Sequence, residues 1–188
     1  MRKVVAQTFL SLDAVMEAPE KWQLPNDLLG EDAGAYVYEA YNAAGALLLG
    51  RVTYEQFAAF WPNQSDDDPF AKRINELPRY VVTRTLKKLD WAGSHAISGK
   101  VTDEVRKLKE ESSGDILIPG SSQLVNGLAG DGLIDEYQLL IHPIVVGKGK
   151  HLFEAGTTPT LFTVVETRTF CTGVVALVCR PRGKAVVS

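Results

Sequence analysis

Short apolar runs alternate with amphipathic stretches along most of this chain of 188 residues. The runs rich in Val, Ile and Leu predict buried strands at residues 3–12, 46–49, 79–83 and 115–118. Stretches with apolar residues three and four positions apart predict helices at residues 31–44, 52–60 and 101–111. Two shorter helices are expected, one ending near residue 77 and one through Leu124, Val125 and Leu128.

The last third of the chain has a different pattern, because strands follow one another without a helix between them. A long strand is predicted at residues 134–146. Residues 161–170 and 174–179 then flank Cys171-Thr172-Gly173, and this spacing predicts a β-hairpin. The order of elements therefore predicts an α/β fold, with a mostly parallel sheet and an antiparallel edge. We expect one domain over residues 1–180 and a frayed, solvated tail that carries Arg180, Arg182 and Lys184, with residues 181–188 outside the domain.

Composition and charge argue against several functional classes. Hydrophobic residues make up 45% and charged residues 23% of the chain, which is typical of a globular protein in water. The formal net charge is −3 and basic residues do not cluster before the tail, so we expect no nucleic-acid partner. No segment has the pattern of a membrane span or a signal peptide. Cys171 and Cys179 show no metal-type spacing, so we expect small buried side chains in a reducing cytoplasm.

Three predicted strands end in residues suited to binding an anion. In a parallel sheet these strand ends lie along one edge, where helix N-termini and arginine side chains bind phosphate. Together they favour a nucleotide site, although the GxGxxG fingerprint of a standard dinucleotide fold is absent. For the first strand end a second interpretation stays open, in which Gly50 closes the strand and Thr53 simply caps the next helix. The three ends are Gly50-Arg51, Thr83-Arg84-Thr85 and Gly120-Ser121-Ser122.

Other polar residues give weaker indications. The run Asp66-Asp67-Asp68 precedes a proline and is more typical of a helix cap than of a metal site. The histidines lack a ligand spacing, so no metal is expected, and His142 is interpreted as structural. Among the carboxylates near the loop that carries Trp22, Asp13 is the best candidate because it directly follows a strand, with solvated surface charge as the competing interpretation. No catalytic residue is assigned.

Five segments, taken in order, carry a resemblance to a known family. They read SLDAVMEAP (11–19), LLLGRVTYEQF (47–57), RYVVTRTL (79–86) and ILIPGSSQLVNGLAGDGLIDEYQLLIHPIVVGKGKHLF (116–153), followed by the closing hairpin. The chain thereby resembles the dihydrofolate reductase-like family over residues 4–179. The resemblance is to the riboflavin-biosynthesis reductase domain in its stand-alone bacterial form.

The resemblance implies a dihydrofolate-reductase-like, three-layer α/β fold that assembles as a homodimer. It also implies an NADPH-dependent reductase of a pyrimidine or pterin-like ring compound, similar to 5-amino-6-(5-phosphoribosylamino)uracil reductase. One alternative is a reductase of the same fold that acts on dihydrofolate or another small molecule. A second alternative is a non-enzymatic protein that binds a nucleotide or another ligand.

The resemblance also implies a role for each matched residue. Asp13 and Trp22 would face the substrate, with Asp32 as a looser positional match. Two departures stand out: Ala14 replaces the glycine of the family's SLDG segment, and Pro119 replaces a substrate-facing glutamate. NADPH would be held by Gly50, Arg51 and Thr53 at its phosphates, by Thr83, Arg84 and Thr85 at the adenosine 2′-phosphate, and by Gly120, Ser121, Ser122, Gln123 and Leu124 along the pyrophosphate and nicotinamide.

Overall fold

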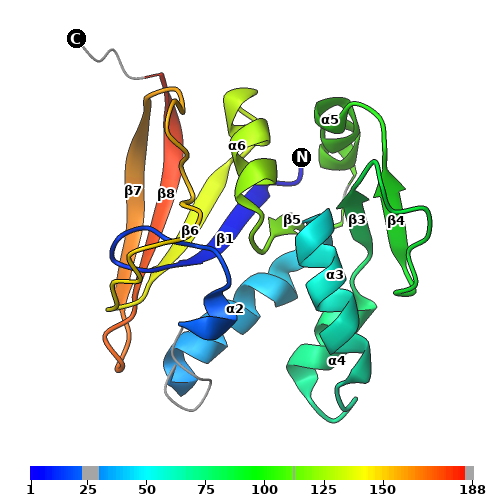
Figure 1. Ribbon diagram of the computed structural model, residues 1–188, viewed down its shortest axis with the longest axis horizontal. Helices are drawn as coiled ribbons and strands as arrows, with labels where there is room; N and C mark the ends of the chain where they lie inside the picture. The colour runs from blue at the N-terminus through cyan, green and yellow to red at the C-terminus, as the bar shows by residue number, and fades with distance from the viewer. Residues whose placement is uncertain (23–29, 112, 185–188) are drawn as a thin grey trace.

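The computed structural model describes residues 1–22, 30–111 and 113–184, and its centre is one eight-stranded sheet (Figure 1). In chain order the strands are β1 (Val4–Leu10), β2 (Ala44–Gly50), β3 (Arg79–Val82), β4 (Ser94–Ile97), β5 (Asp115–Ile118), β6 (Glu136–Ile141), β7 (Thr160–Thr169) and β8 (Val175–Lys184). Their order in the sheet is β4-β3-β2-β5-β1-β6-β8-β7. All pairs from β4 to β6 are parallel, and β8 pairs antiparallel with both β6 and β7. The predicted mixed sheet with a C-terminal antiparallel hairpin is confirmed.

Helices cover both faces of the sheet, so the fold has the three layers that the resemblance implied. Leu47 and Leu49 point into one core with α2, α3 and α4, while Leu48 points into the other with α5 and α6. This alternation follows from the two-residue period of a strand. Figure 1 shows α5 and α6 in its upper part and α2 and α4 in its lower part. The helices are α2 (Glu31–Ala43), α3 (Arg51–Phe60), α4 (Pro69–Glu76), α5 (Val101–Glu110) and α6 (Ser122–Gly130), with short 3₁₀ turns η1 (Pro19–Lys21) and η2 (Trp61–Asn63).

Several boundaries differ from those expected. β6 ends at Ile141, well before the predicted residue 146, because Pro143 has no N–H to donate to a neighbouring strand. The short strand β4 was not predicted, since most of its side chains are at least partly exposed and it has no apolar run. β8 continues to Lys184, which pairs with Thr160, so the segment expected to fray is part of the sheet up to that residue. Residues 23–29 of the predicted loop and 185–188 of the predicted tail lie outside the described residues.

The two cysteines differ in their exposure. Cys179 is buried on β8, as expected, and it lies opposite Tyr137 of β6. Cys171 is exposed, and the prediction that it is buried is wrong. The reason is that Cys171 lies at the turn of the predicted hairpin between β7 and β8, where the chain reverses away from the core.

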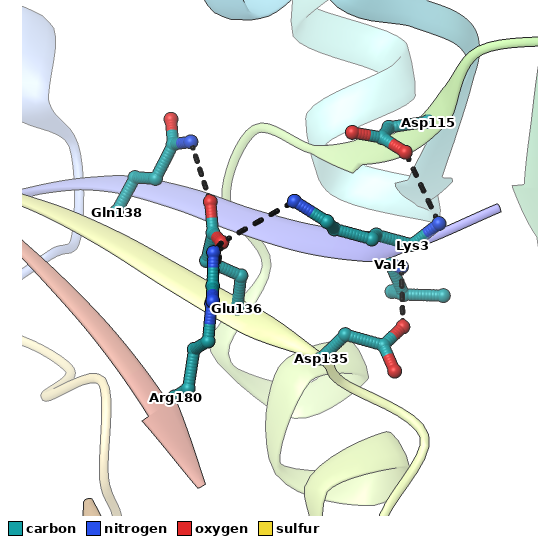
Figure 2. Close-up of polar contacts among 7 residues, drawn as sticks. All are labelled: Lys3, Val4, Asp115, Asp135, Glu136, Gln138 and Arg180. Carbon is teal, nitrogen blue, oxygen red and sulfur yellow. Dashed lines mark hydrogen bonds and ion pairs between the residues drawn. The ribbon is translucent and has the colours of Figure 1, made fainter. Parts of the chain in front are cut away.

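A polar network joins the strands at the end of the sheet where the parallel strands begin (Figure 2). The carboxylate of Glu136 accepts from Arg180 at 2.9 Å and from Gln138 at 3.1 Å, with the Lys3 ammonium 3.6 Å away. Burial would raise the pKa of Glu136, but these hydrogen bonds and positive charges outweigh it and lower that pKa. The backbone amide of Val4 donates to Asp135 at 2.7 Å. The polar groups at this end of the sheet therefore form hydrogen bonds and ion pairs with one another.

Candidate functional site

A large cleft runs along the opposite end of the sheet, at the carboxyl ends of β3, β2 and β5. Its volume is about 1940 Å³, well above the roughly 300–1,000 Å³ of a pocket for one small ligand. It therefore has room for a dinucleotide and a second molecule. All eleven residues predicted to bind the cofactor line this cleft, namely Gly50, Arg51, Thr53, Thr83, Arg84, Thr85, Gly120, Ser121, Ser122, Gln123 and Leu124.

The first strand end leads directly into α3. The helix begins at Arg51, its N-cap is Gly50, and no described side chain accepts a hydrogen bond from its first amides. The alternative in which Thr53 caps this helix is therefore wrong, because Thr53 lies within the first turn. The free N–H groups and the positive end of the helix dipole are left for an anion in the cleft.

Gly50 is required by a close approach of two chain segments. A Cβ atom at this position would lie 2.3 Å from Oγ of Ser121 and 3.1 Å from its Cβ. Ser121 is the N-cap of α6, has a φ of 72°, and also makes no side-chain cap. The uncapped starts of α3 and α6 therefore lie next to each other at the centre of the cleft.

The strand end at Thr83-Arg84-Thr85 carries an arginine that makes no ion pair or hydrogen bond with any described residue. The Oγ of Thr83 accepts from the amides of Thr85 at 3.2 Å and Leu86 at 3.1 Å, which forms a tight turn after β3. Arg84 lies in this turn and is exposed. Arg51, by contrast, forms an ion pair with Glu55 at 2.8 Å. Both of those side chains are about half exposed, so the pair is weak enough to exchange for a bound anion.

Trp22, for which a substrate contact is predicted, also lines the cleft. Its indole N–H donates to the carbonyl of Glu17 at 2.8 Å, and its ring meets His142 edge-on at 5.7 Å. His142 is fully buried, and this burial lowers its pKa, which favours the neutral ring. The interpretation of His142 as a structural residue agrees with this placement.

The carboxylate of Asp13 faces a loop and is not among the residues that line the cleft. It accepts from the Ser11 hydroxyl at 2.6 Å and from the amides of Val146 at 3.1 Å and Gly147 at 2.7 Å. These hydrogen bonds lower the pKa of Asp13 to about 2. Because Val146 and Lys148, on either side of Gly147, do line the cleft, Asp13 supports the cleft wall from behind. The adjacent Ala14 has a φ of 60°, a conformation that favours glycine, which explains why the family motif has glycine there.

Asp32 is also placed away from the cleft. Its carboxylate accepts from the amide of Cys171 at 2.9 Å and from the thiol at 3.2 Å, and these bonds lower the pKa of Asp32. It thereby joins the start of α2 to the turn between β7 and β8. The structure thus brings together the eleven cofactor candidates and Trp22, but neither Asp13 nor Asp32.

The cleft is also lined by aromatic side chains of α2, α3 and α4 that were not assigned to a site from the sequence. They include Phe57 and Phe60 of α3, which follow Thr53 at helical spacing and so share its face of the helix. In the sequence, this helical spacing could have indicated that the two rings belong to the site. A helix packed on a core has the same spacing, so the spacing alone does not distinguish the two cases. Only the arrangement of α2, α3 and α4 shows which of these rings reach the cleft.

Two further observations bear on other classes of site. Asp68 accepts a hydrogen bond from the amide of Phe70 at 2.9 Å and so caps α4, as the sequence predicted. Within the described part of the chain, no three His, Cys, Asp or Glu side chains gather as metal ligands would. Nor does any helix there have the length and apolar character that crossing a membrane requires.

Comparison with known proteins places the chain in a sequence family and a fold. A family model described as the RibD C-terminal domain matches residues 2–176. The protein YyaP of Bacillus subtilis strain 168, which is described as uncharacterized, is 29% identical over 180 residues, covering 94% of each chain. A putative riboflavin biosynthesis protein from Shewanella sp. PV-4 has the same fold, with a TM-score of 0.74 and 19% identity over 96% of this chain and 99% of that one. A dihydrofolate reductase from Enterococcus faecalis, in complex with NADP(H), has a TM-score of 0.63 and 14% identity, covering 96% of each chain.

Proposed function

The chain belongs to the RibD C-terminal domain family, and we propose that it is an NADPH-dependent reductase of a pyrimidine or pterin-like ring compound, similar to 5-amino-6-(5-phosphoribosylamino)uracil reductase. One observation carries the proposal. The uncapped N-termini of α3 and α6 line one cleft at the carboxyl ends of parallel strands, together with the side chain of Arg84, which pairs with no described residue. This arrangement suits a ligand with several phosphates.

The residues present fit the phosphates of NADPH. The amides that follow Gly50 and Ser121 offer two adjacent groups of donors for a pyrophosphate. Arg84 is exposed beside the cleft and available for the adenosine 2′-phosphate, to which a guanidinium donates two parallel hydrogen bonds. When bound, NADPH supplies the hydride.

The remaining task of the chain is to position a ring compound and to exclude water. Trp22 offers an aromatic surface for such a ring at the wall of the cleft. Asp13 acts through the loop that it holds, and is therefore proposed as a positioning residue. Pro119 stands where the biosynthetic reductases of the family have a glutamate. Hydride transfer depends more on close positioning than on a strong acid, so the reaction does not require that glutamate.

The test is to measure NADPH oxidation with the aminouracil ribosyl phosphate, dihydrofolate and simple quinones in turn. Oxidation with the aminouracil or another ring compound supports the proposal, and the preferred compound distinguishes it from a reductase of different specificity. Tight binding of NADPH with no oxidation of it by any ring compound would favour the binding-protein alternative. Absence of NADPH binding would overturn the proposal.

A further inference from the structure

His142 lies behind the wall of the cleft, directly after β6. Its backbone amide donates to the carbonyl of Leu10 at 2.7 Å, which holds it beside the end of β1. The residue is fully buried, and its imidazole meets two rings edge-on, Phe9 at 5.3 Å and Trp22 at 5.7 Å between centroids. Phe9 and Trp22 both line the cleft, whereas His142 does not. His142 therefore supports the Trp22 ring from behind.

The imidazole of His142 is a buried polar group without a hydrogen bond. Neither Nδ1 nor Nε2 has a partner among the described residues. Leaving such a group unpaired destabilises the fold, and native structures contain few examples. An apolar side chain of similar size would fill the same space without this cost. The property that distinguishes an imidazole from such a side chain is that it gains a proton near neutral pH.

No described charged group is placed to balance a proton on His142. β1, which supplies Phe9, has no titratable side chain. On the segment that carries Trp22, the Asp13 carboxylate is bound to two backbone amides of the loop after β6, and Glu17 lies 3.9 Å from the Lys150 ammonium. None of the charged groups on the two segments forms an ion pair or hydrogen bond with His142, and burial lowers its pKa. Over residues 11–22 and 143–150 these groups are Asp13, Glu17, Glu20, Lys21, Lys148 and Lys150.

A proton on His142 would create a buried cation without a partner, which costs far more than an unpaired neutral ring. The two rings beside it are held differently. Phe9 belongs to β1, which lies inside the sheet between β5 and β6. Trp22 follows the three-residue turn η1, and one hydrogen bond to the Glu17 carbonyl holds its indole. The N-cap of that turn, Ala18, has a φ of 51°, which is unfavourable for alanine. Trp22 is therefore the ring that moves when water must reach a charged imidazole.

We propose that His142 is a positioning residue, which supports Trp22 at the cleft wall when neutral and releases that ring when protonated. The inference rests on the proposed function, in which Trp22 offers a surface for the ring compound, and it adds the protonation state that this surface requires. Binding of the ring compound then weakens in acid, about tenfold for each pH unit below the pKa of His142. The cofactor end does not depend on His142, because α3 and α6 follow β2 and β5 rather than β6.

The first test is an NMR titration of the full chain without ligand, from about pH 8 to about pH 4. It follows the imidazole C–H resonances of His142 and of the exposed His95 and His151. We expect His142 to titrate below the other two. The indole N–H resonance of Trp22, assigned with Trp22→Phe, should shift with the same midpoint as His142.

Variants of His142 separate its proton from its packing. His142→Phe keeps a ring but cannot be protonated, so the Trp22 resonance should lose its pH dependence. His142→Met, which is smaller, provides a second side chain that does not titrate and should behave in the same way. His95→Phe is the matched control, at an exposed histidine of β4, and should retain the acid transition of Trp22.

The second test measures KM for the ring compound that the NADPH oxidation assay identifies, over the same pH range. The ratio of KM in wild type to KM in His142→Phe cancels the titration of the compound and of the cofactor. It should rise about tenfold for each pH unit below the His142 midpoint, while the ratio of kcat values stays constant.

The outcomes separate this inference from the proposed function. A His142 pKa at or above those of His95 and His151, or no titration of His142 before the chain unfolds, would overturn the inference. A Trp22 resonance that does not follow His142, or a KM ratio that is constant with pH, would also overturn it. All four results leave the proposed function standing. Absence of NADPH oxidation with every ring compound would instead count against the proposed function, and the NMR titration would still decide whether His142 controls Trp22.

Discussion

At the scale of single residues, the charged side chains in and around the cleft fall into two groups. Some have no partner among the described residues, and the others already form ion pairs or hydrogen bonds. Arg84 is exposed and has no ion-pair partner among the described residues, whereas Arg51 is paired with Glu55. Asp13 and Asp32 are both satisfied by backbone amides of distant segments. The free side chain is the one available to a ligand, and the satisfied ones hold the walls in position.

We expect Arg84→Ala to remove a preference for NADPH over NADH. A charge-assisted pair between the guanidinium and the extra phosphate is worth about 1.5–3 kcal/mol, or roughly ten- to a hundredfold in affinity. Titration of both cofactors by fluorescence measures this, and the affinity for NADH should not change. Arg106→Ala, at an exposed arginine of α5 paired with Asp103, is the matched control. Equal affinities of the wild type for the two cofactors would contradict the assignment.

Asp13 gives a prediction about pH. Its pKa in the folded chain, about 2, lies below the usual 3.8, so its ionised form stabilises the fold. That contribution is complete above about pH 4 and is lost as the pH falls through 2. Asp13→Asn should therefore lower the Tm at neutral pH, and the difference from wild type should shrink steadily toward pH 2. A difference in Tm that stays constant over this range would refute the role of the carboxylate.

The same variant tests the proposed positioning role of Asp13. Because the loop that it holds lines the cleft through Val146 and Lys148, Asp13→Asn should lower kcat/KM for the ring compound. The affinity for NADPH should be unchanged, since the eleven cofactor candidates are held by other contacts. A loss of NADPH affinity equal to the loss in kcat/KM would show that Asp13 acts on the cofactor side.

At the scale of elements, the cleft depends on how closely the end of β2 approaches the start of α6. Both helices that begin there lack a side-chain cap, and a glycine at the end of β2 allows Ser121 to lie against it. A helix start without a cap leaves unsatisfied amides, which is a cost to stability. A bound anion accepts hydrogen bonds from these amides and offsets the cost. The junction is therefore less stable by itself than with its ligand bound.

Gly50→Ala tests the junction. The added Cβ would lie 2.3 Å from the Ser121 Oγ and 3.1 Å from its Cβ, so the hydroxyl must rotate away and Ser121 must shift by a few tenths of an ångström. We expect lower thermal stability and weaker NADPH binding, and a larger loss of both for Gly50→Val. Removing the opposing side chain in the double variant Gly50→Ala with Ser121→Gly should restore most of the stability. A drop in Tm with unchanged NADPH affinity would instead indicate a purely structural role for Gly50.

At the scale of the whole molecule, the two edges of the sheet differ. β4 is a short edge strand of four residues, whereas β7 is an edge strand of ten residues. Leu161, Val164 and Val165 of β7 are exposed by 55%, 54% and 42%. A long edge with exposed apolar side chains is the kind of surface that pairs with another chain.

The homodimer implied by the family resemblance is therefore expected to form through β7. Size-exclusion chromatography with light scattering should give the mass of two chains. Replacing Val164 and Val165 together by lysine should give the mass of one chain, because charges on an edge strand oppose pairing. Val145→Lys, at a valine that is 67% exposed and lies outside β7, is the control and should leave the dimer intact. A single-chain mass for the wild type at all concentrations would contradict this expectation.

Apart from β4 and the short 3₁₀ turns, the sequence by itself determined the order of the helices and strands, and the side of the sheet on which the cofactor candidates gather. Both follow from local information, because apolar runs such as residues 46–49 end where glycine and polar residues begin. Parallel strands then bring those ends to one edge. The spacing around Cys171 predicted the hairpin for the same reason. These features depend on residues that are near neighbours in the chain.

Only the tertiary structure decided which polar groups remain available and which rings reach the cleft. Two backbone amides that donate to Asp13 lie 133 and 134 positions away, and the amide of Cys171 that donates to Asp32 lies 139 positions away. Likewise, β8 continues to Lys184 because β7 provides a pairing partner along its whole length. Phe60 has the same helical spacing as a core residue, and it lines the cleft because of where α2 and α4 pack. Contacts between residues far apart in the chain leave no periodic pattern in the sequence, so they could be found only in the folded protein.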